Sequence, residues 1–235
     1  MSDLQPSRPL RIGLVVEGHT DSVVLRAAIS SLLPTRELQF TVVQPDFSVA
    51  FGGTGEGWSG VYHWCRQAAS EGGGSVSGSI ALLNHDAIVI QLDADVAEET
   101  YQRGHIYDET TIDLPCVQPC PPANATTDAL RIVALRWMNS AALPTKCVFC
   151  TPSKTMEAWV MKALFPQNTH VKSHNWECHS SPEGQLGQQP KPTRIAKSRR
   201  DYESRRQELI EGWPRVRSLS EAERFSQEFM NAIGT

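Results

Sequence analysis

Acidic residues follow two apolar segments of the chain, with a spacing that suits metal chemistry. Glu17 comes directly after the apolar segment 10–16, and Asp93 and Asp95 come directly after a second one, 87–92. Two aspartates at positions i and i+2 point to the same side of an extended chain. If the segments are neighbouring strands of one sheet, the three carboxylates lie at one edge. Mg²⁺ and Mn²⁺ prefer such oxygen ligands, so the pattern predicts a divalent-metal site.

Two further carboxylates could bind a second ion. Asp21 lies just beyond Glu17, and Glu157 follows a third apolar segment, 146–150. Two ions about 4 Å apart can activate a water molecule and stabilise the leaving oxygen of a phosphodiester. Both residues also have structural interpretations. Asp21 could cap a helix, and Glu157 could complement a helix dipole from the first turn.

A nuclease also needs cations that hold the scissile phosphate. Residues 191–217 hold nine Lys and Arg against four Asp and Glu, whereas residues 1–190 hold 12 against 19. The basic segment therefore carries a charge of +5, next to an acidic body of −7. A solvated helix with its own ion pairs is the alternative interpretation. The candidate nucleic-acid-binding residues are Lys154, Lys191, Arg194, Lys197, Arg199 and Arg200, and Lys197 is also a candidate for catalysis.

Strand and helix patterns alternate along the chain, which predicts an α/β fold with a mostly parallel sheet flanked by helices. Ligands usually bind such sheets at the carboxyl ends of the strands, where the acidic residues are expected. We expect strands at 10–16, 40–43, 86–92 and 146–150, and helices that begin near residues 20, 59, 127, 153, 193 and 220.

The length of 235 residues suits one large domain with an extension. We divide it into a catalytic part, 10–165, and a C-terminal basic helical extension, 166–235. In the extension we expect an irregular polar stretch at 166–190 and a basic helix at 193–211. A final helix should begin with a capping box formed by Ser220 and Glu223.

Composition and cysteine content indicate the cellular setting. No apolar run approaches the roughly 20 residues of a membrane helix, and the start of the chain lacks the apolar region of a secretory signal. We therefore expect a cytoplasmic protein whose six cysteines are reduced. Zinc binding by Cys147-x-x-Cys150 with Cys116 and Cys120 is an alternative, although cysteines on an apolar strand are more often buried thiols.

A glycine-rich segment at 51–58 could pass for a phosphate-binding loop. It lacks the Gly-Lys-Ser/Thr of a P-loop and the spacing of a dinucleotide-binding turn. A connection between elements is the simpler interpretation.

The acidic motifs resemble a known family. Glu17-Gly-x-Thr-Asp21 after the first strand, with Asp93-x-Asp95 after a later one, resembles the TOPRIM domain of topoisomerases, primases, small maturation ribonucleases and OLD-family nucleases. The later motif Ser153-x-x-x-Glu157-x-Trp159 resembles an extension found in OLD-like and related stand-alone TOPRIM proteins. The resemblance covers roughly residues 10–165.

The resemblance implies that Glu17, Asp93 and Asp95 bind Mg²⁺ or Mn²⁺ and support the cleavage or formation of phosphodiester bonds. No segment is long enough for a topoisomerase gate or a primase zinc module, so a nuclease is the favoured member. DNA is the expected substrate ahead of RNA, in antiviral defence or repair. OLD proteins join an ATPase domain to the TOPRIM domain, so a separately encoded ATPase is an expected partner.

Two other functions stay open from the sequence. The chain could be an inactive subunit that binds nucleic acid or acts as a scaffold in a larger, ATPase-containing complex. It could also be a transferase that uses Asp93-x-Asp95 to hold a nucleotide-sugar diphosphate, although Glu17 would then have no role.

Overall fold

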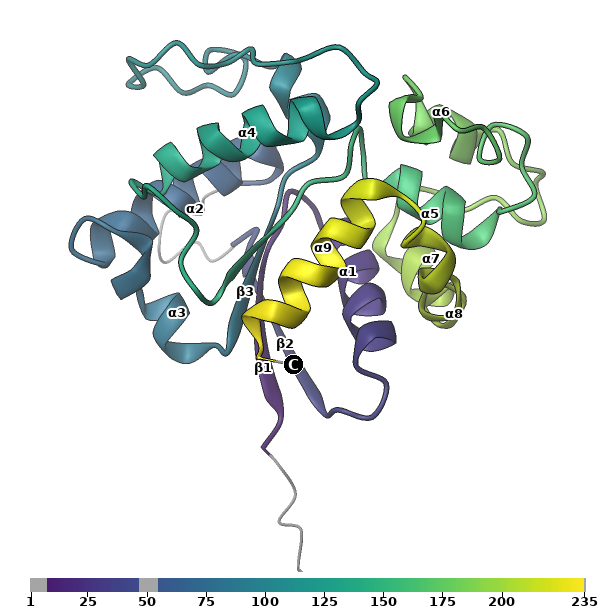
Figure 1. Cartoon of the computed structure of the whole chain (residues 1–235), viewed down its shortest axis with the longest axis horizontal. Helices are drawn as coiled ribbons and strands as arrows, with labels where there is room; N and C mark the ends of the chain where they lie inside the picture. Colours follow the sequence, from purple (N-terminus) through teal and green to yellow (C-terminus); the bar gives the residue numbers. More distant parts are fainter. Residues whose placement is uncertain (1–7, 47–54, 235) are drawn as a thin grey trace, which may run out of the picture.

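The computed structural model describes residues 8–46 and 55–234, and it is built around a parallel four-stranded sheet in the order β2-β1-β3-β4. Each neighbouring pair of strands is parallel, and Val15 at the end of β1 is in register with Ile90 of β3. The carboxyl ends of these two central strands therefore meet at one edge (Figure 1). The strands are β1 (Leu10–Val15), β2 (Leu38–Gln44), β3 (Ala87–Gln91) and β4 (Cys147–Cys150).

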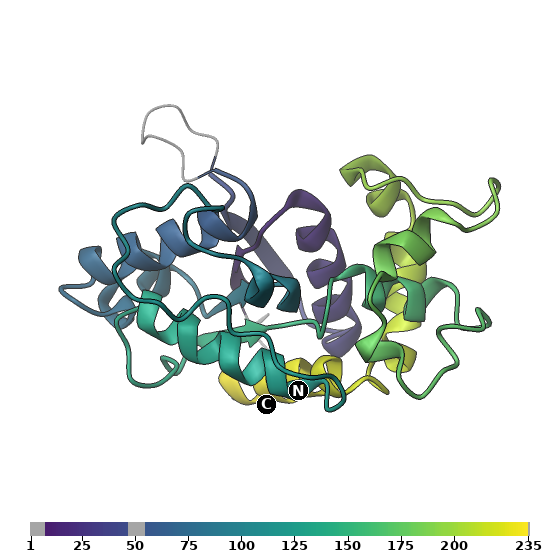
Figure 2. The same ribbon diagram turned by 90° about the horizontal axis from the view of Figure 1, so that it is seen from above.

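Helices cover both faces of the sheet, which explains why β1 and β3 are almost entirely apolar. On one face lie α1 (His19–Leu32), α5 (Glu157–Leu164), α8 (Arg206–Val216) and α9 (Ser220–Ala232). The other face is covered by α2 (Gly57–Glu71), α3 (Ile80–Asn84) and α4 (Asn124–Trp137). Viewed from above, α2 and α4 lie on one side of the molecule, and α5 to α8 on the other (Figure 2).

The two faces of the sheet form two separate cores, because successive side chains of a strand point in opposite directions. Val89 and Val148 pack with α1, α5, α8 and α9, whereas Ile88 and Ile90 pack with α2 and α4. Gly212 allows α8 to lie close to α5, since a Cβ atom there would be only 2.8 Å from the Cβ of Ala163.

These elements confirm the expected α/β fold with a parallel sheet and a helical C-terminal region. Most strand and helix boundaries differ by one to three residues from those expected. The residues that precede α5 differ more, because segment 151–156 forms a loop before the helix begins at Glu157. The glycine-rich segment 51–58 lies largely outside the described residues.

The expected continuous basic helix at 193–211 is wrong. Segment 193–198 is not helical, and the chain then forms two helices, α7 (Arg199–Ser204) and α8, which meet at Arg205. The hydroxyl of Ser198 accepts a hydrogen bond of 3.2 Å from the backbone N–H of Asp201, so the helix is capped five residues later than expected. The stretch 166–190 also includes short helices, η4 (Trp176–Cys178) and α6 (Pro182–Gly187).

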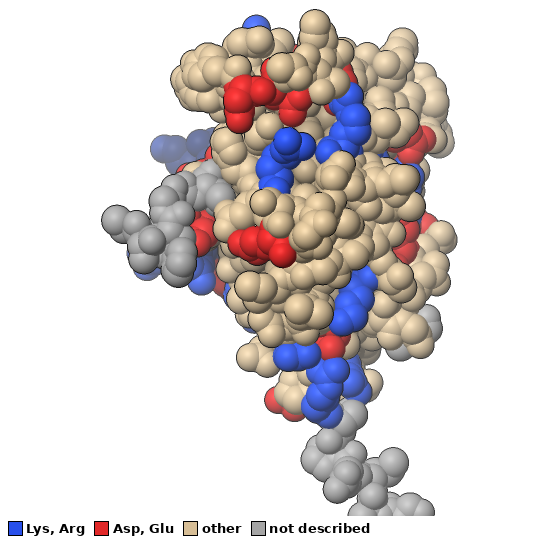
Figure 3. Space-filling model, turned by 90° about the vertical axis from the view of Figure 1, so that its left-hand side faces the viewer, with Lys and Arg blue, Asp and Glu red and all other residues tan. Residues whose placement is uncertain are grey.

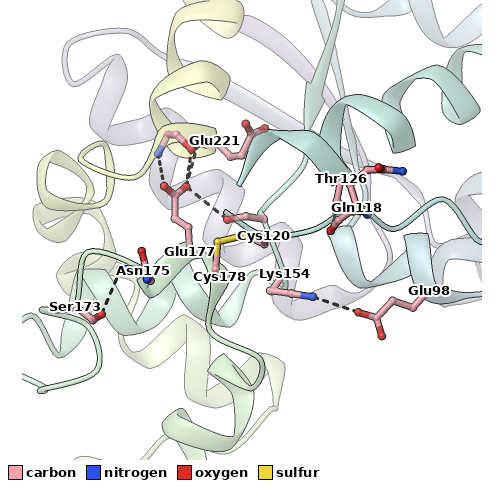
Figure 4. The surroundings of a disulfide bond; sticks show 12 residues. Glu98, Gln118, Cys120, Thr126, Lys154, Ser173, Asn175, Glu177, Cys178 and Glu221 are labelled. Atoms are coloured by element: carbon pink, nitrogen blue, oxygen red, sulfur yellow. Dashed lines mark hydrogen bonds and ion pairs between the residues drawn. A yellow bond between two sulfur atoms is a disulfide. The ribbon is translucent and has the colours of Figure 1, made fainter. Parts of the chain in front are cut away.

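The expected capping box at the start of α9 is also wrong. Glu177 of η4 accepts hydrogen bonds from the backbone N–H of Ser220 at 2.8 Å and of Glu221 at 3.2 Å (Figure 4). Glu223 instead forms an ion pair with Arg217, with 2.7 Å between Arg217 Nε and Glu223 Oε2. A distant carboxylate therefore satisfies the N–H groups that the local sequence was expected to satisfy.

The expectation that all six cysteines are reduced is wrong for two of them. Cys120 and Cys178 form a disulfide that links the proline-rich loop before α4 to η4 (Figure 4). Cys147 and Cys150 are free and buried, and they pack in the two different cores on opposite faces of β4. That arrangement does not bring their sulfur atoms to one zinc site.

On the face that carries α2 and α3, lysine and arginine side chains alternate with acidic ones and form no broad basic area (Figure 3). In the part of the chain that the structure describes, no helix is both long and apolar enough to cross a membrane.

Candidate metal centre

The carboxyl ends of β1 and β3 bring Glu17 and Asp93 into direct contact. The backbone N–H of Asp93 donates a hydrogen bond of 2.7 Å to Oε1 of Glu17. The two residues are 76 positions apart in the chain, so the contact depends on the parallel pairing of β1 with β3. The acidic groups that follow the two strands thus share one corner of the sheet.

Gln91, which the sequence analysis did not single out, holds both residues in place. Its Oε1 accepts a hydrogen bond of 3.0 Å from the backbone N–H of Glu17, and its Nε2 donates one of 2.8 Å to Oδ1 of Asp93. The side chain is fully buried. Its signal in the sequence is that Gln91 is the one polar residue in the apolar segment 87–92.

The loop after β4 is tied to the same corner. Oδ1 of Asp93 accepts a second hydrogen bond, 3.1 Å long, from the backbone N–H of Met156. These contacts use Oε1 of Glu17 and Oδ1 of Asp93. The second oxygen of each carboxylate therefore takes part in none of the hydrogen bonds described above and is a possible cation ligand.

Burial and mutual repulsion raise the pKa values of the carboxylates at this corner. The pKa of Glu17 and that of Asp93 are well above their ordinary values, chiefly because both side chains are removed from water. Burial followed by repulsion from Glu157 raises the pKa of Asp21 to about 7 and that of Asp95 to about 6. Each group thus senses the charge of the others, and the corner favours a bound cation or a proton.

The structure places Asp21 in the first turn of α1 and not at its N-cap, and metal binding by Asp21 stays a prediction. Gly18 is the N-cap of α1, and its backbone N–H donates to the carboxylate of Asp21 in the first turn. In a capping box the side chain at the third helical position accepts a hydrogen bond from the backbone N–H of the N-cap residue, and this contact has the same arrangement. The same carboxylate is buried and lies within electrostatic range of Glu17 and Glu157.

Glu157 faces the corner from the start of α5. Its side chain is 2% exposed, and its Oε1 lies 3.3 Å from Nζ of Lys197 and 3.4 Å from the hydroxyl of Tyr202. Its Oε2 is buried and has no hydrogen-bond partner among the described residues. A buried carboxylate oxygen without a partner is costly unless something else pairs with it.

Lys197 brings a positive charge from the non-helical segment 193–198 to this corner. Its ammonium group lies between Glu157 and Glu183, with the second contact at 3.5 Å, and its side chain is 51% exposed. Partial burial lowers the pKa of Lys197, but attraction to Glu157 and Glu183 outweighs that effect and raises it above the ordinary value. The ammonium is therefore charged at neutral pH.

The other basic candidates do not reach the carboxylates in the same way. The side chain of Lys154 pairs with Glu98 at 3.2 Å and affects the carboxylate of Asp95 through its charge, while the backbone oxygen of Lys154 accepts a hydrogen bond of 3.3 Å from the N–H of Asp95. The remaining four are exposed, and Arg194 donates to the backbone oxygen of Gln189. These four are Lys191, Arg194, Arg199 and Arg200.

The residues at the corner fit a hard divalent cation in chemistry. They supply buried carboxylate oxygens, and the buried Oε2 of Glu157 and Oγ1 of Thr155 have no hydrogen-bond partner within the described ranges. Their spacing is not that of a closed metal site. Within residues 8–46 and 55–234, no three His, Cys, Asp or Glu side chains are placed so that they could hold a metal ion together.

Comparisons with protein-family models, with curated proteins and with solved structures gave no match to this chain. The resemblance to TOPRIM proteins therefore depends on the acidic motifs alone.

Proposed function

We propose that this protein is a divalent-metal-dependent nuclease that hydrolyses phosphodiester bonds. The observation that supports this function best is the hydrogen bond between Glu17 and Asp93. It joins the ends of two parallel strands within a cluster of buried carboxylates whose pKa values are raised. Such a cluster is costly without a cation, and functional sites are where this cost is commonly accepted.

Glu17, Asp93 and Asp95 would hold Mg²⁺ or Mn²⁺ through their carboxylate oxygens. Asp21 and Glu157 are the proposed ligands of a second ion. When bound, the metal supplies a Lewis acid that polarises the scissile phosphate and lowers the pKa of the attacking water. Gln91 would keep the carboxylates of Glu17 and Asp93 in orientation through the hydrogen bonds that it forms with both segments.

Lys197 is the proposed catalytic cation of the chain itself. Its ammonium group could move from Glu157 to a non-bridging oxygen of the phosphate, because half of the side chain is exposed and the partner Glu183 is also at the surface. It would spread the negative charge of the transition state. The exposed Lys191, Arg194, Arg199 and Arg200, together with Lys154, are proposed to bind the rest of the nucleic acid.

The proposed setting has two sources. The resemblance to OLD-like TOPRIM proteins implies DNA ahead of RNA as substrate, a role in antiviral defence or repair, and a separately encoded ATPase partner. The cytoplasmic location is proposed from the sequence, and the disulfide between Cys120 and Cys178 is unusual for that compartment.

A cleavage assay tests the proposal. Purified protein is incubated with single- and double-stranded DNA and RNA, with Mg²⁺, Mn²⁺ or EDTA. We expect cutting only with a divalent ion, and we expect Asp93→Asn combined with Asp95→Asn to abolish it. The double variant of two exposed residues, Asp108→Asn with Glu71→Gln, is the matched control and should cut like the unmodified protein. Equal cutting by the Asp93/Asp95 variant would assign the activity to a contaminant.

The alternative is a nucleic-acid-binding or scaffolding subunit without catalysis. It is favoured by the absence of a ready-made metal group among the described residues and by the position of Lys197 beside Glu157. Titration calorimetry with Mn²⁺ separates the two functions. No heat of binding, together with salt-sensitive binding of DNA, would support the subunit.

A further inference from the structure

A cavity lined by three arginines lies beside α1, outside the carboxylate corner. Its volume is about 440 Å³, and its walls come from the second half of α1, the turn before β2 and the start of α8. Arg26, Arg36 and Arg206 line it together with Ser30, and Leu33 and Phe40 are among the apolar residues at its side. None of the three arginines belongs to the basic residues proposed above to bind nucleic acid.

Two of these arginines are held at the cavity with donors that lack partners. The Nε atoms of Arg26 and of Arg206 are buried and have no hydrogen-bond partner in the described part of the chain. The guanidinium of Arg26 lies over the ring of Phe40, with 5.8 Å between Cζ and the ring centroid. This distance is within the range of a cation–π interaction, which favours the position of the guanidinium beside the ring.

Other arginines act on Arg26 at this cavity. Burial is the main effect that lowers the pKa of Arg26; among its charged neighbours Glu203 raises the pKa, and Arg199 and Arg206 lower it. Arg36 uses one N–H group to bind the backbone oxygen of Arg8 at 3.1 Å. A cavity that gathers like charges and unpaired donors is unfavourable when empty and favourable with an anion.

We propose that the cavity lined by Arg26, Arg36 and Arg206 binds a phosphate group of a nucleic-acid strand. A guanidinium presents parallel N–H groups that match two oxygens of a phosphate, and three such groups around one cavity suit a tetrahedral oxyanion. The chemistry is shared by a phosphodiester of the strand and by free phosphate. The strand is the assigned source because α1 carries both Arg26 of the cavity and Asp21 of the carboxylate corner.

The spacing along α1 sets where on the strand this phosphate lies, and this step depends on the proposed nuclease function. Arg26 is five residues beyond Asp21, which is about 7.5 Å along the helix axis, and Ser30 is about 13.5 Å beyond it. One strand bound at the metal-binding corner could therefore reach the cavity within a few nucleotides. Arg199 at the start of α7 acts electrostatically on Arg26 and would lie along the same path.

The test is binding of a fluorescent 12-nucleotide single strand, measured by anisotropy in EDTA so that no cleavage is required. Arg26→Gln with Arg206→Gln should weaken binding at least about 10-fold and lower the slope of log Kd against log salt by about one to two. Arg103→Gln is the matched control, because Arg103 is exposed and its ion pair in the described part of the chain is with Glu99, four residues earlier. Thermal melting of each variant, and the milder Arg206→Gln alone, distinguish a lost contact from a lost fold.

Unchanged strand binding by the folded double variant would overturn the proposal. A second arm replaces the strand by inorganic phosphate and measures the thermal stability of the protein. Stabilisation by phosphate that the double variant loses, with strand binding intact, would assign the cavity to a free phosphate and also overturn it. Weakened strand binding combined with no cleavage by the unmodified protein would support this cavity and contradict the nuclease function.

Discussion

Oε1 of Glu17 accepts a 2.7 Å hydrogen bond from the backbone N–H of Asp93, and this contact fixes the end of β3 relative to the end of β1. It gives Glu17 two separable roles. The oxygen that accepts the hydrogen bond positions Asp93, and the negative charge would attract a cation. A substitution that keeps the oxygen but removes the charge separates them.

We expect Glu17→Gln to preserve the fold and to lose metal binding. Its amide oxygen can still accept from Asp93, and removal of a buried charge relieves repulsion with Asp21 and Asp95. Substitution of residues that only orient the metal ligands commonly reduces metal affinity 10- to 100-fold. Loss of a direct ligand should therefore reduce the affinity for Mn²⁺ at least about 100-fold. Calorimetry measures the affinity and circular dichroism the melting temperature. Unchanged affinity would remove Glu17 from the metal site.

Metal-free protein should lose stability as the pH rises from about 4 to 7. The pKa of Asp21 is raised to about 7 in the folded protein, so its contribution to stability is present below its ordinary pKa and is lost as the pH passes through 7. Mn²⁺ should reduce or reverse this loss. Asp21→Asn should flatten the profile and stabilise the metal-free protein at pH 8 by about 1–3 kcal/mol.

Melting temperatures measured in EDTA across the pH range check this prediction. Asp108→Asn, at an exposed aspartate, is the control and should keep the slope of the unmodified protein. If the melting temperature of the unmodified protein does not change with pH, ionisation of the corner carboxylates does not destabilise the fold.

Lys197→Gln should change metal affinity and cleavage in opposite directions. Loss of the ammonium beside Glu157 leaves more negative charge at the corner, so Mn²⁺ should bind more tightly. Cleavage at saturating Mn²⁺ should fall about 100-fold, because a donor to the phosphate is lost. Lys172→Gln, at an exposed lysine with no proposed role in binding, is the control. A parallel fall in both quantities would indicate a structural role for Lys197.

Gln91→Leu should destabilise the protein by about 1–3 kcal/mol, because the N–H of Glu17 loses its acceptor and Oδ1 of Asp93 loses one of its two donors. The side chain of Gln91 is fully buried, and it forms hydrogen bonds with both the backbone N–H of Glu17 and the carboxylate of Asp93. Urea unfolding gives the change in free energy. Gln67→Leu, at an exposed glutamine of α2, should have almost no effect. Equal stability of the two variants would refute the bridging role.

Cys120→Ser with Cys178→Ser should lower the free energy of unfolding by about 2–4 kcal/mol. The disulfide spans 58 residues, and a cross-link over such a distance removes considerable entropy from the unfolded chain. It also restrains η4, where Glu177 caps α9. Cys116→Ser serves as the control, since that cysteine is free. If reductant leaves the melting temperature of the unmodified protein unchanged, the cross-link has no stabilising effect.

The sheet could be predicted from the sequence because its information is local. β1 and β3 are buried on both faces and therefore appear as short apolar runs, each ending where the acidic residues begin. The contact of Glu17 with Asp93 then follows from the general rule that parallel strands end at a common edge. Asp21 and Glu157 follow the same logic, since both lie in the first turn of a helix that begins at that edge.

The other features of the structure depend on contacts between distant segments. Such contacts leave no periodic pattern in the sequence. Lys197 reaches Glu157 from a non-helical segment, although its basic composition favoured a continuous helix. Glu177 caps α9 from 43 residues away, and the partner of Cys120 lies 58 residues along the chain. Such pairings are selected by the packed structure, and the local sequence is compatible with several of them.

The last helix also determines how the protein can be divided. Phe225 and Phe229 of α9 are fully buried in the same core as Ile12 of β1 and Val148 of β4. A fragment that stops after Phe165 would keep α1 and α5 but lose α8 and α9, and would leave part of that side of the sheet exposed and prone to aggregation. Anyone who wishes to transplant the acidic corner into another protein must therefore take the C-terminal helices with it.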